Sequence, residues 1–414
     1  MRAAHINLSS EDTAGQTALA ICQTLQAAGH AALFCYALGG IPEGVPSYRI
    51  GSKPDRAAHK ALSRVLDCAG FCSRGATKGL TEQLRLYKPD LVHLHTLHGY
   101  YLHLPELMDY LAGANIPVVW TLYDSWPYTG HCAAYGMARC ERFRAGCGSC
   151  PNKGEYPDSL VLDRSEKNWQ RKRAAIEKIE NLTLVAPSQW MAEELRKSFL
   201  ASRPVCVIPG GIDLTMFHPA GTADVEAVTA RYGLQRHGSK PILLSVARTW
   251  RAARGINDLM DLHEELKHEA VIAVVGLKPG QMEYLPPGMI GVPVIYGLDT
   301  LRALYTAADI CLSLRYEDAQ DRTLAEALAC GTQVVCYNQT SLPEAITEDT
   351  GMAVHTGSVQ SVVDACRALL ETPKDPLFCM ERAQAFDREA ELQTYMGLYG
   401  ELVRDARQKQ AGRD

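Results

Sequence analysis

Three arginines and a glycine follow a buried strand that we expect in the C-terminal half of the chain. The strand is predicted over residues 242–247, and the loop Arg248-Thr-Trp-Arg-Ala-Ala-Arg254-Gly255 then leads into a helix expected over 257–266. Guanidinium groups match phosphate oxygens through paired N–H donors, and a helix N-terminus adds partial positive charge. The loop is therefore a candidate phosphate-binding site. The alternative is a set of solvated surface arginines.

Two carboxylates lie after the strand expected over 310–314. Asp318 precedes a predicted helix that starts at Arg322, and Glu326 lies within that helix. Placed in this way, the two side chains could accept hydrogen bonds from sugar hydroxyls and from a ribose. The alternative makes Asp318 a loop or capping residue and Glu326 a buried hydrogen-bond partner.

Four cysteines stand close together in a loop that is rich in Gly and Arg. They are Cys132, Cys140, Cys147 and Cys150, within residues 131–151. A short loop can fold four thiolates around one zinc ion or one iron–sulfur cluster, and the sequence does not choose between them. Free structural thiols are the alternative, since disulfides are rare in cytoplasmic proteins.

Further polar side chains cluster near strand ends in the N-terminal half. His93, His95 and His98 lie around the end of a strand expected over 91–95, and Asp124 follows one expected over 118–122. We interpret them as candidates for hydrogen bonding to a substrate. A structural role for the histidines, and loop bonding or helix capping by Asp124, remain open.

The elements that carry these residues alternate between apolar, β-branched strands and helix-period segments, which predicts an α/β fold with mostly parallel sheets. A length of 414 residues favours two domains. Ligands of such sheets bind beyond the carboxyl ends of the strands, so two facing doubly wound, Rossmann-like domains predict a central cleft. The expected strands are 3–8, 32–37, 91–95, 118–122 and 182–186, then 242–247, 271–275, 293–296, 310–314 and 333–337.

We place the domain boundary where a strand-like segment gives way to Pro-Gly-Gly. The expected domains are residues 1–204, which contain the cysteine-rich loop, and residues 205–380. Helices expected over 381–414 are too long for one closing helix, so we predict that they pack back on the N-terminal domain.

Composition limits the classes of function. The chain is 47% hydrophobic and 21% charged, as in a globular protein, and no apolar run reaches the length of a membrane span. We therefore expect a cytoplasmic protein. Residues 1–204 carry a net positive charge and the rest a net negative charge, which favours the N-terminal domain for peripheral contact with the inner face of the membrane. The sequence contains no basic run with interleaved aromatic residues, so it does not suggest a nucleic-acid partner.

The segment Asp318…Glu326-Ala-Leu-Ala-Cys-Gly331, followed by Leu342-Pro-Glu344, resembles the signature of retaining family 4 glycosyltransferases of the GT-B fold. Residues 93–100 and 120–132 resemble a subgroup of that family that builds bacterial exopolysaccharide and colanic acid. The chain differs from the subgroup pattern at Tyr123, at Gly210 and at 319–321. The resemblance implies two Rossmann-like domains and hexosyl transfer with retention, without a catalytic divalent metal.

The resemblance also implies roles for single residues. Arg248, Arg254 and Gly255 would bind the donor diphosphate, Asp318 would hold the sugar, and Glu326 with Leu342 and Glu344 would contact the nucleotide. His93, His95, His98, Tyr123 and Asp124 would face the acceptor, a saccharide or lipid-linked saccharide. The four-cysteine site would be structural, because sugar transfer needs no redox step. Two alternatives remain, a non-catalytic nucleotide-binding partner of the same fold and a nucleotide-sugar epimerase.

Overall fold

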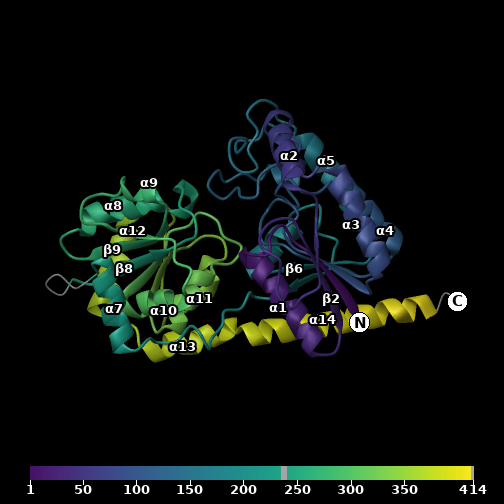
Figure 1. The fold of residues 1–414 in the computed structure, drawn as a ribbon. Coiled ribbons are helices and arrows are strands. Elements are labelled where there is room, and N and C mark those ends of the chain that lie inside the picture. The colour runs from purple at the N-terminus through teal and green to yellow at the C-terminus, as the bar shows by residue number, and fades with distance from the viewer. Residues whose placement is uncertain (235–239, 412–414) are drawn as a thin grey trace. The chain divides into compact units, whose positions relative to one another are not determined.

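A computed structural model describes residues 1–234 and 240–411 and divides the chain into two compact α/β units (Figure 1). The first unit comprises Met1–Ile208 together with Leu392–Asp414, and the second comprises Pro209–Glu391. Each unit has its own parallel sheet, so each positions its own set of candidate residues.

The first unit contains a seven-stranded parallel sheet with the order β3-β2-β1-β4-β5-β6-β7. Its central strands are buried along their whole length, as expected for strands covered by helices on both faces. The strands are β1 (Arg2–Ile6), β2 (Ala31–Tyr36), β3 (Ser47–Arg49), β4 (Leu91–Leu94), β5 (Val118–Thr121), β6 (Leu182–Ala186) and β7 (Val205–Val207).

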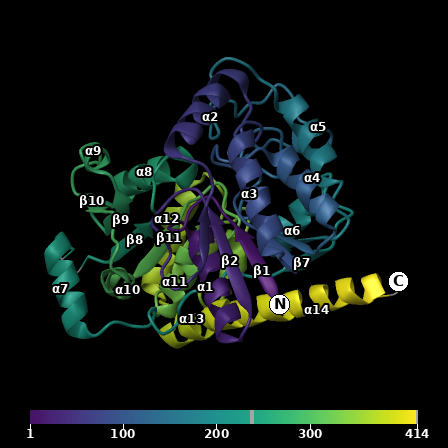
Figure 2. The same ribbon diagram turned by 45° about the vertical axis from the view of Figure 1, so that its right-hand side comes forward.

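Helices connect these strands and cover both faces of the sheet. In both ribbon views α1 lies on one face, and α3 and α4 lie on the other (Figures 1 and 2). The helices are α1 (Thr13–Ala27), α2 (Lys53–Leu66), α3 (Arg74–Tyr87), α4 (Leu104–Ala114), α5 (Ser165–Ile176) and α6 (Gln189–Arg196), with the 3-10 turn η1 (Arg142–Arg144) in the cysteine-rich loop.

The C-terminal helix α14 (Arg388–Ala411) completes the core of the first unit. Its residues from Leu392 onward belong to that unit, and Tyr395 and Tyr399 pack with Val119 and Val185 of the sheet. Both tyrosines are buried, at 1% and 0% exposure. The core of the first unit is therefore assembled from the two ends of the chain.

The second unit contains a six-stranded parallel sheet with the order β10-β9-β8-β11-β12-β13. Its core is formed by buried aliphatic side chains of the strands and of the helices packed on them. The strands are β8 (Ile242–Val246), β9 (Val271–Leu277), β10 (Ile290–Pro293), β11 (Ile310–Ser313), β12 (Val334–Tyr337) and β13 (Gly351–Val354). The helices are α7 (Thr222–Tyr232), α8 (Ile256–Leu266), α9 (Pro279–Met282), α10 (Leu298–Ala307), α11 (Arg322–Ala329), α12 (Val359–Glu371) and α13 (Pro376–Ala383), with the turns η3 (Ala252–Arg254), η4 (Leu342–Ala345) and η5 (Gln384–Phe386).

The boundaries that differ from the sequence prediction include those of one strand and the division between the two units. The strand expected over 293–296 lies over 290–293, where Ile290 and Val292 pair with β9 and the register shifts at Pro293. Proline has no N–H to continue a ladder, so the strand ends there. The division between units falls after Ile208 and not after Pro204, because Val205–Val207 forms β7 and pairs with β6.

Within residues 1–234 and 240–411, no helix is both long enough and apolar enough to cross a membrane.

Candidate functional site

The loop after β8 brings Arg254 to the carboxyl end of the neighbouring strand β11. Gly255 adopts a left-handed conformation, with φ of 78°, and serves as the N-cap of α8. A Cβ at this position would lie 2.2 Å from the carbonyl oxygen of Leu314. Only glycine combines this φ with so close an approach. The glycine also has no side chain to satisfy the first N–H groups of α8, which leaves them for a ligand.

Asp318 lies between two guanidinium groups at this edge of the sheet. Its Oδ2 atom is 2.6 Å from Nη1 of Arg254 and 2.7 Å from Nη1 of Arg315, and Oδ1 accepts a bond from the backbone N–H of Gln320 at 3.2 Å. Burial alone would raise the pKa of Asp318, but the charges of Arg254 and Arg315 bring that pKa below its ordinary value. The side chain is therefore a carboxylate at neutral pH.

Arg315 holds the carboxylate of Asp318 in place, a role that the sequence did not predict. It is 8% exposed, and its Nη2 donates to the carbonyl of Val246 at 2.8 Å while its Nη1 lies 3.0 Å from Oδ1 of Asp321. Asp321, and not Asp318, caps helix α11 by accepting from the N–H of Thr323. Arg315 stands two residues after a buried strand, with carboxylates three and six residues later, and that spacing could have indicated the cluster.

Glu326 occupies a separate position on α11 within the same charged neighbourhood. Its Oε2 accepts a hydrogen bond from Oη of Tyr305 on α10 at 2.8 Å. Burial raises the pKa of Glu326 to about 7, and the charge of Arg322 acts in the opposite direction. Near pH 7 the carboxyl group is thus a mixture of its neutral and charged forms.

The loop that contains Leu342 and Glu344 lies along the loop that contains Asp318. The hydroxyl of Ser341 donates to the carbonyl oxygen of Asp318 at 2.8 Å, and Nε2 of Gln339 donates to the carbonyl of Tyr316 at 2.6 Å. Leu342 is fully buried in the core, whereas Glu344 is partly exposed. The side chain of Leu342 therefore packs in the core, and the contact of this loop with a nucleotide stays a prediction.

Arg248 lies two residues beyond the end of β8 and is exposed. Because β8, β11 and β12 are parallel neighbours, the segments after them meet at one edge of the sheet. The structure thus brings Arg254, Asp318 and the 339–345 loop into contact there and places Arg248 on the same edge.

Two of the positions that differ from the family pattern contact each other. The side-chain amide of Gln320 accepts from the N–H of Gly210 at 2.6 Å and donates to the carbonyl of Gly210 at 2.7 Å. A Cβ on residue 210 would lie 2.4 Å from Oε1 of Gln320. Because residue 210 has no side chain, Gln320 can form both of these hydrogen bonds to its backbone.

Two of the predicted acceptor-side histidines are buried in the first unit. His93 is 0% exposed and hydrogen-bonds Thr121 through Nε2, at 2.8 Å, and Tyr399 through Nδ1. His95 is 2% exposed, with Nε2 3.1 Å from Nδ1 of His5. Burial lowers the pKa of both histidines well below the ordinary value, so both are neutral. The prediction that they face an acceptor is wrong, because their nitrogens join the sheet to α14 and β1.

Tyr123 links this buried network to a more accessible group. Its Oη lies 3.3 Å from Nδ1 of His95, and the tyrosine itself is partly exposed. Nearby in the sequence, Asp124 lies 2.7 Å from Nε2 of His98, and Nδ1 of His98 lies 2.8 Å from Oη of Tyr156. The side chains of His98 and Asp124 keep 14% and 21% of their surface exposed. His98 and Asp124 therefore remain candidates for contact with an acceptor.

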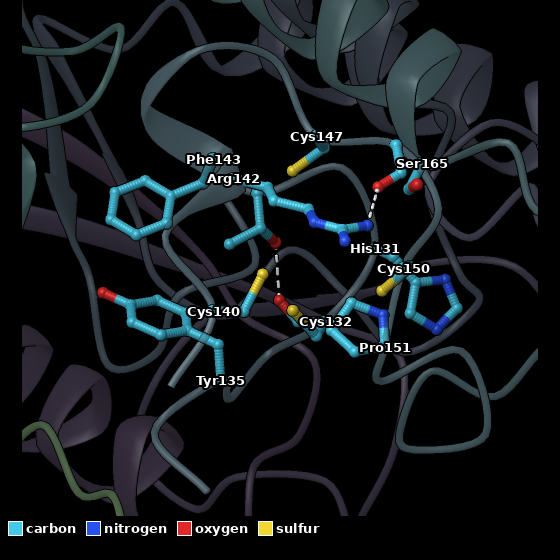
Figure 3. Close-up of a pocket in the computed structure, with 12 residues that line it drawn as sticks. His131, Cys132, Tyr135, Cys140, Arg142, Phe143, Cys147, Cys150, Pro151 and Ser165 are labelled. Carbon is cyan, nitrogen blue, oxygen red and sulfur yellow. Dashed lines mark hydrogen bonds between the residues drawn. The ribbon is translucent and has the colours of Figure 1, made fainter. Parts of the chain in front are cut away.

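The four predicted metal ligands line one small cavity in the first unit. Cys132, Cys140, Cys147 and Cys150 surround about 20 Å³ of space, and their side chains enter it from different sides (Figure 3). A cavity of this size has room for one atom or one water molecule. The loop therefore gathers the cysteines that the sequence singled out.

Comparison with known proteins places both units in described families. The model of the family described as Glycosyltransferase Family 4 matches residues 14–216, and that described as Glycosyl transferases group 1 matches residues 240–372. WcaC of Escherichia coli (strain K12), whose name assigns it to glycosyl transfer in colanic acid biosynthesis, is 25% identical over 331 residues, which cover 76% of this chain and 77% of WcaC.

Solved structures agree on the fold. Sucrose-phosphate synthase of Thermosynechococcus elongatus has a TM-score of 0.70 at 18% identity, with coverage of 98% of this chain and 100% of that one. HepE of Anabaena, solved in complex with UDP, has a TM-score of 0.68 at 14% identity, with coverage of 97% and 100%. The two units thus have the Rossmann-like architecture of GT-B enzymes. Since the two family models together span most of the sequence, this chain belongs to the glycosyltransferases, with a family 4 domain followed by a group 1 domain.

Proposed function

We propose that the chain transfers a hexose with retention of configuration from a nucleotide-sugar donor to an acceptor hydroxyl. The observation that carries this proposal is the contact of Arg254 with Asp318, beside the uncapped N-terminus of α8. HepE, which shares the fold, was solved with UDP, with UDP and glucose, and with UDP-glucose. Retention is proposed from the resemblance to retaining family 4 enzymes.

In this proposal the second unit stabilises the leaving nucleotide. Arg248, Arg254 and the first N–H groups of α8 neutralise the charge that develops on the diphosphate as the glycosidic bond breaks. Fixed donors of this kind are usually the largest contribution to catalysis. Asp318, which remains ionised, accepts bonds from sugar hydroxyls, and Glu326 accepts from the nucleotide ribose. The positive charge at the site is supplied by the chain's own groups, so the proposed step uses no divalent metal.

The first unit supplies the acceptor side of the proposed reaction. His98, which follows β4, and Asp124, which follows β5, form a partly exposed hydrogen-bonded pair. Asp124 is held in place by the N–H of Trp126, which donates to its Oδ1 at 2.8 Å. We assign this pair to orienting the acceptor hydroxyl. The similarity to WcaC favours a saccharide or lipid-linked saccharide acceptor in exopolysaccharide synthesis.

The donor is tested by thermal unfolding in the presence of a panel of nucleoside diphosphates and their sugars. A ligand at 100 times its dissociation constant stabilises the folded state by about 2.7 kcal/mol, so one nucleotide should raise the melting temperature selectively. Incubation of that sugar nucleotide with the chain alone separates transfer from epimerisation, since an epimerase converts the donor without an acceptor. The absence of any selective shift across the panel would contradict the proposal.

We further propose that the first unit contacts anionic membrane surfaces through α2 and the segment beside it. Leu62 and Val65 on α2 are exposed, and so are Leu160 and Val161, whose segment bonds the backbone of Arg64 through the N–H of Leu160. Lys53, Lys60 and Arg64 are exposed on the same helix. Exposed apolar side chains next to basic ones are typical of peripheral membrane contacts.

Co-sedimentation with vesicles tests this surface. We expect the chain to pellet with vesicles that contain phosphatidylglycerol and to stay in solution with pure phosphatidylcholine. The double variant Leu160→Ser, Val161→Ser should reduce the bound fraction. Equal binding of the variant and the original chain would contradict the assignment of the surface.

A further inference from the structure

The cysteine-rich loop presents its sulfur atoms in a setting that suits an anionic metal–thiolate centre. The N–H of Gly130 donates to Sγ of Cys147 at 3.1 Å. Gly130 is required for this contact, because a Cβ there would lie 1.9 Å from the carbonyl oxygen of Ser165. Burial raises the pKa of the Cys147 thiol to about 11, and the hydrogen bond from Gly130, which stabilises charge on sulfur, acts in the opposite direction.

His131 is a further lining residue of the same cavity. It is 2% exposed and lines the cavity beside Cys132 and Cys150 (Figure 3). Its Nδ1 lies 2.6 Å from Oδ1 of Asp67, whose Oδ2 accepts the N–H of Arg164 at 2.7 Å. Nε2 of His131 is buried without a hydrogen-bond partner in the described part of the chain.

This pairing of His131 with Asp67 is the one that metal-binding histidines commonly show. A carboxylate that accepts the proton of one ring nitrogen fixes the tautomer and leaves the lone pair of the other nitrogen available to a metal. A buried ring nitrogen without a partner otherwise costs stability. A metal ligand role would account for the unpaired Nε2 of His131, which differs from the unpaired ring nitrogens of His5, His59 and His263 in lying in a residue that lines the four-cysteine cavity.

A buried lysine provides positive charge next to the cavity. Lys172 is 0% exposed, and its Nζ donates to the carbonyls of Trp126, at 2.6 Å, and of Thr129, at 3.0 Å. Among residues 1–234 and 240–411, no carboxylate lies within ion-pair distance of this ammonium group, although buried charges usually have a partner. Burial lowers the pKa of Lys172 to about 7, and negative charge on Cys147 and Cys132 would act in the opposite direction. A cation together with its thiolate ligands can carry a net negative charge. Such a centre would supply the counter-charge that Lys172 lacks.

Another set of metal-type donors in the described chain is largely satisfied by protein groups, although Nε2 of His5 is buried without a hydrogen-bond partner there. His5, His93 and His95 bring three ring nitrogens within 4.8 Å of one another, which the cysteines of the loop do not achieve. However, His5 bonds His95, and both nitrogens of His93 bond Thr121 and Tyr399. To bind a metal ion, the cysteine side chains of the loop would rotate toward the centre of the cavity, since zinc–sulfur bonds are about 2.3 Å long.

We propose that this cavity binds one thiophilic divalent cation of the zinc class, and that Nε2 of His131 is a ligand beside thiolates of the four-cysteine loop. Binding releases the protons of the coordinating thiols to solvent, and no electron is transferred. The cation would tie the loop to Trp126 and Thr129 through Lys172, close in the sequence to Asp124. The proposal is independent of the nucleotide site in the second unit.

The metal content of the purified full-length chain tests this proposal. We expect about one equivalent of zinc by elemental analysis, as for a closed structural site. His131→Gln and Cys147→Ser should each lose most of it, whereas Cys206→Ser, a partly exposed cysteine on β7 outside the loop, should retain it. Asp67→Asn should weaken zinc affinity about 10- to 100-fold, as loss of a carboxylate behind a metal-bound histidine usually does.

Cobalt substitution provides a readout that does not depend on the folding of variants. Cobalt(II) bound in place of zinc should give intense sulfur-to-cobalt charge-transfer absorption and the visible bands of a tetrahedral ion. Full retention of zinc by His131→Gln would overturn the histidine ligand. Iron with acid-labile sulfide, or four thiols that react freely in a chain that takes up no zinc or cobalt, would overturn the site itself.

Discussion

Arg254→Ala is expected to lower the rate of sugar transfer about 100- to 1,000-fold, the usual effect of removing one fixed donor to a developing charge. Arg254 contacts Asp318 at the end of β11 and lies next to the N-terminus of α8. The variant should also lose the increase in melting temperature that a nucleoside diphosphate produces. Steady-state kinetics with the donor found by thermal unfolding checks the first effect, and the same unfolding assay checks the second.

Arg251→Ala is the matched control for this prediction. Arg251 belongs to the same loop, three residues earlier, and is exposed. Its removal should leave transfer within a few-fold of the original rate. Asp318 keeps its contact with Arg315 in the Arg254 variant, so the fold of the second unit should persist. Equal activities of the two variants would remove Arg254 from the proposed diphosphate site.

Arg315→Met is expected to lower the free energy of unfolding of the second unit by about 3–5 kcal/mol, as breaking a buried ion pair usually does. The arginine is almost fully buried and lies against Asp318 and Asp321, and the side chain of Asp321 has no exposed surface. Without the guanidinium, two neighbouring carboxylates lose their shared counter-charge. Denaturant unfolding, followed by the fluorescence of Trp250 in the second unit, measures the change.

Two further variants separate buried charge from charge in general. Asp321→Asn combined with Arg315→Met should recover part of the lost stability, because the uncompensated charge is reduced. Arg367→Met removes the ion pair with Glu269, whose side chains are both 49% exposed, and should cost less than about 1 kcal/mol. A loss for Arg315→Met as small as that for Arg367→Met would contradict the anchoring role.

The contact between Arg254 and Asp318 follows from a pattern that is visible in the sequence. Both residues come shortly after buried strands, and the carboxyl ends of parallel neighbours meet at one edge of a sheet. The same reasoning placed Glu326 in a helix that starts at Arg322, as observed. It missed that Arg315 joins Asp318 to Asp321. The spacing of the three residues could have indicated a cluster, but the contacts themselves depend on side-chain geometry that spacing does not encode.

The buried histidines show which contacts the local sequence pattern cannot predict. Alternation along a strand correctly puts His93 and His95 on one side of the sheet. Which helix covers that side is decided by α14, whose Tyr399 follows His93 by 306 residues. Without this packing partner, a polar pair near a strand end indicates a substrate contact as readily as a buried network. The unpaired nitrogen of His131 was missed for a similar reason, since Asp67 is 64 residues away.

The core of the first unit contains residues from both terminal segments of the chain. This arrangement affects how the first unit can fold during synthesis. During synthesis the sheet from β1 to β7 is complete after about half of the chain, but Tyr395 and Tyr399 are added close to the end. The second unit contains all of its own segments earlier and can fold as a unit when they emerge. A fragment that stops at Ile208 would leave the apolar face meant for α14 open to water. Expression of the N-terminal sheet alone would therefore require the terminal helix to be supplied as well.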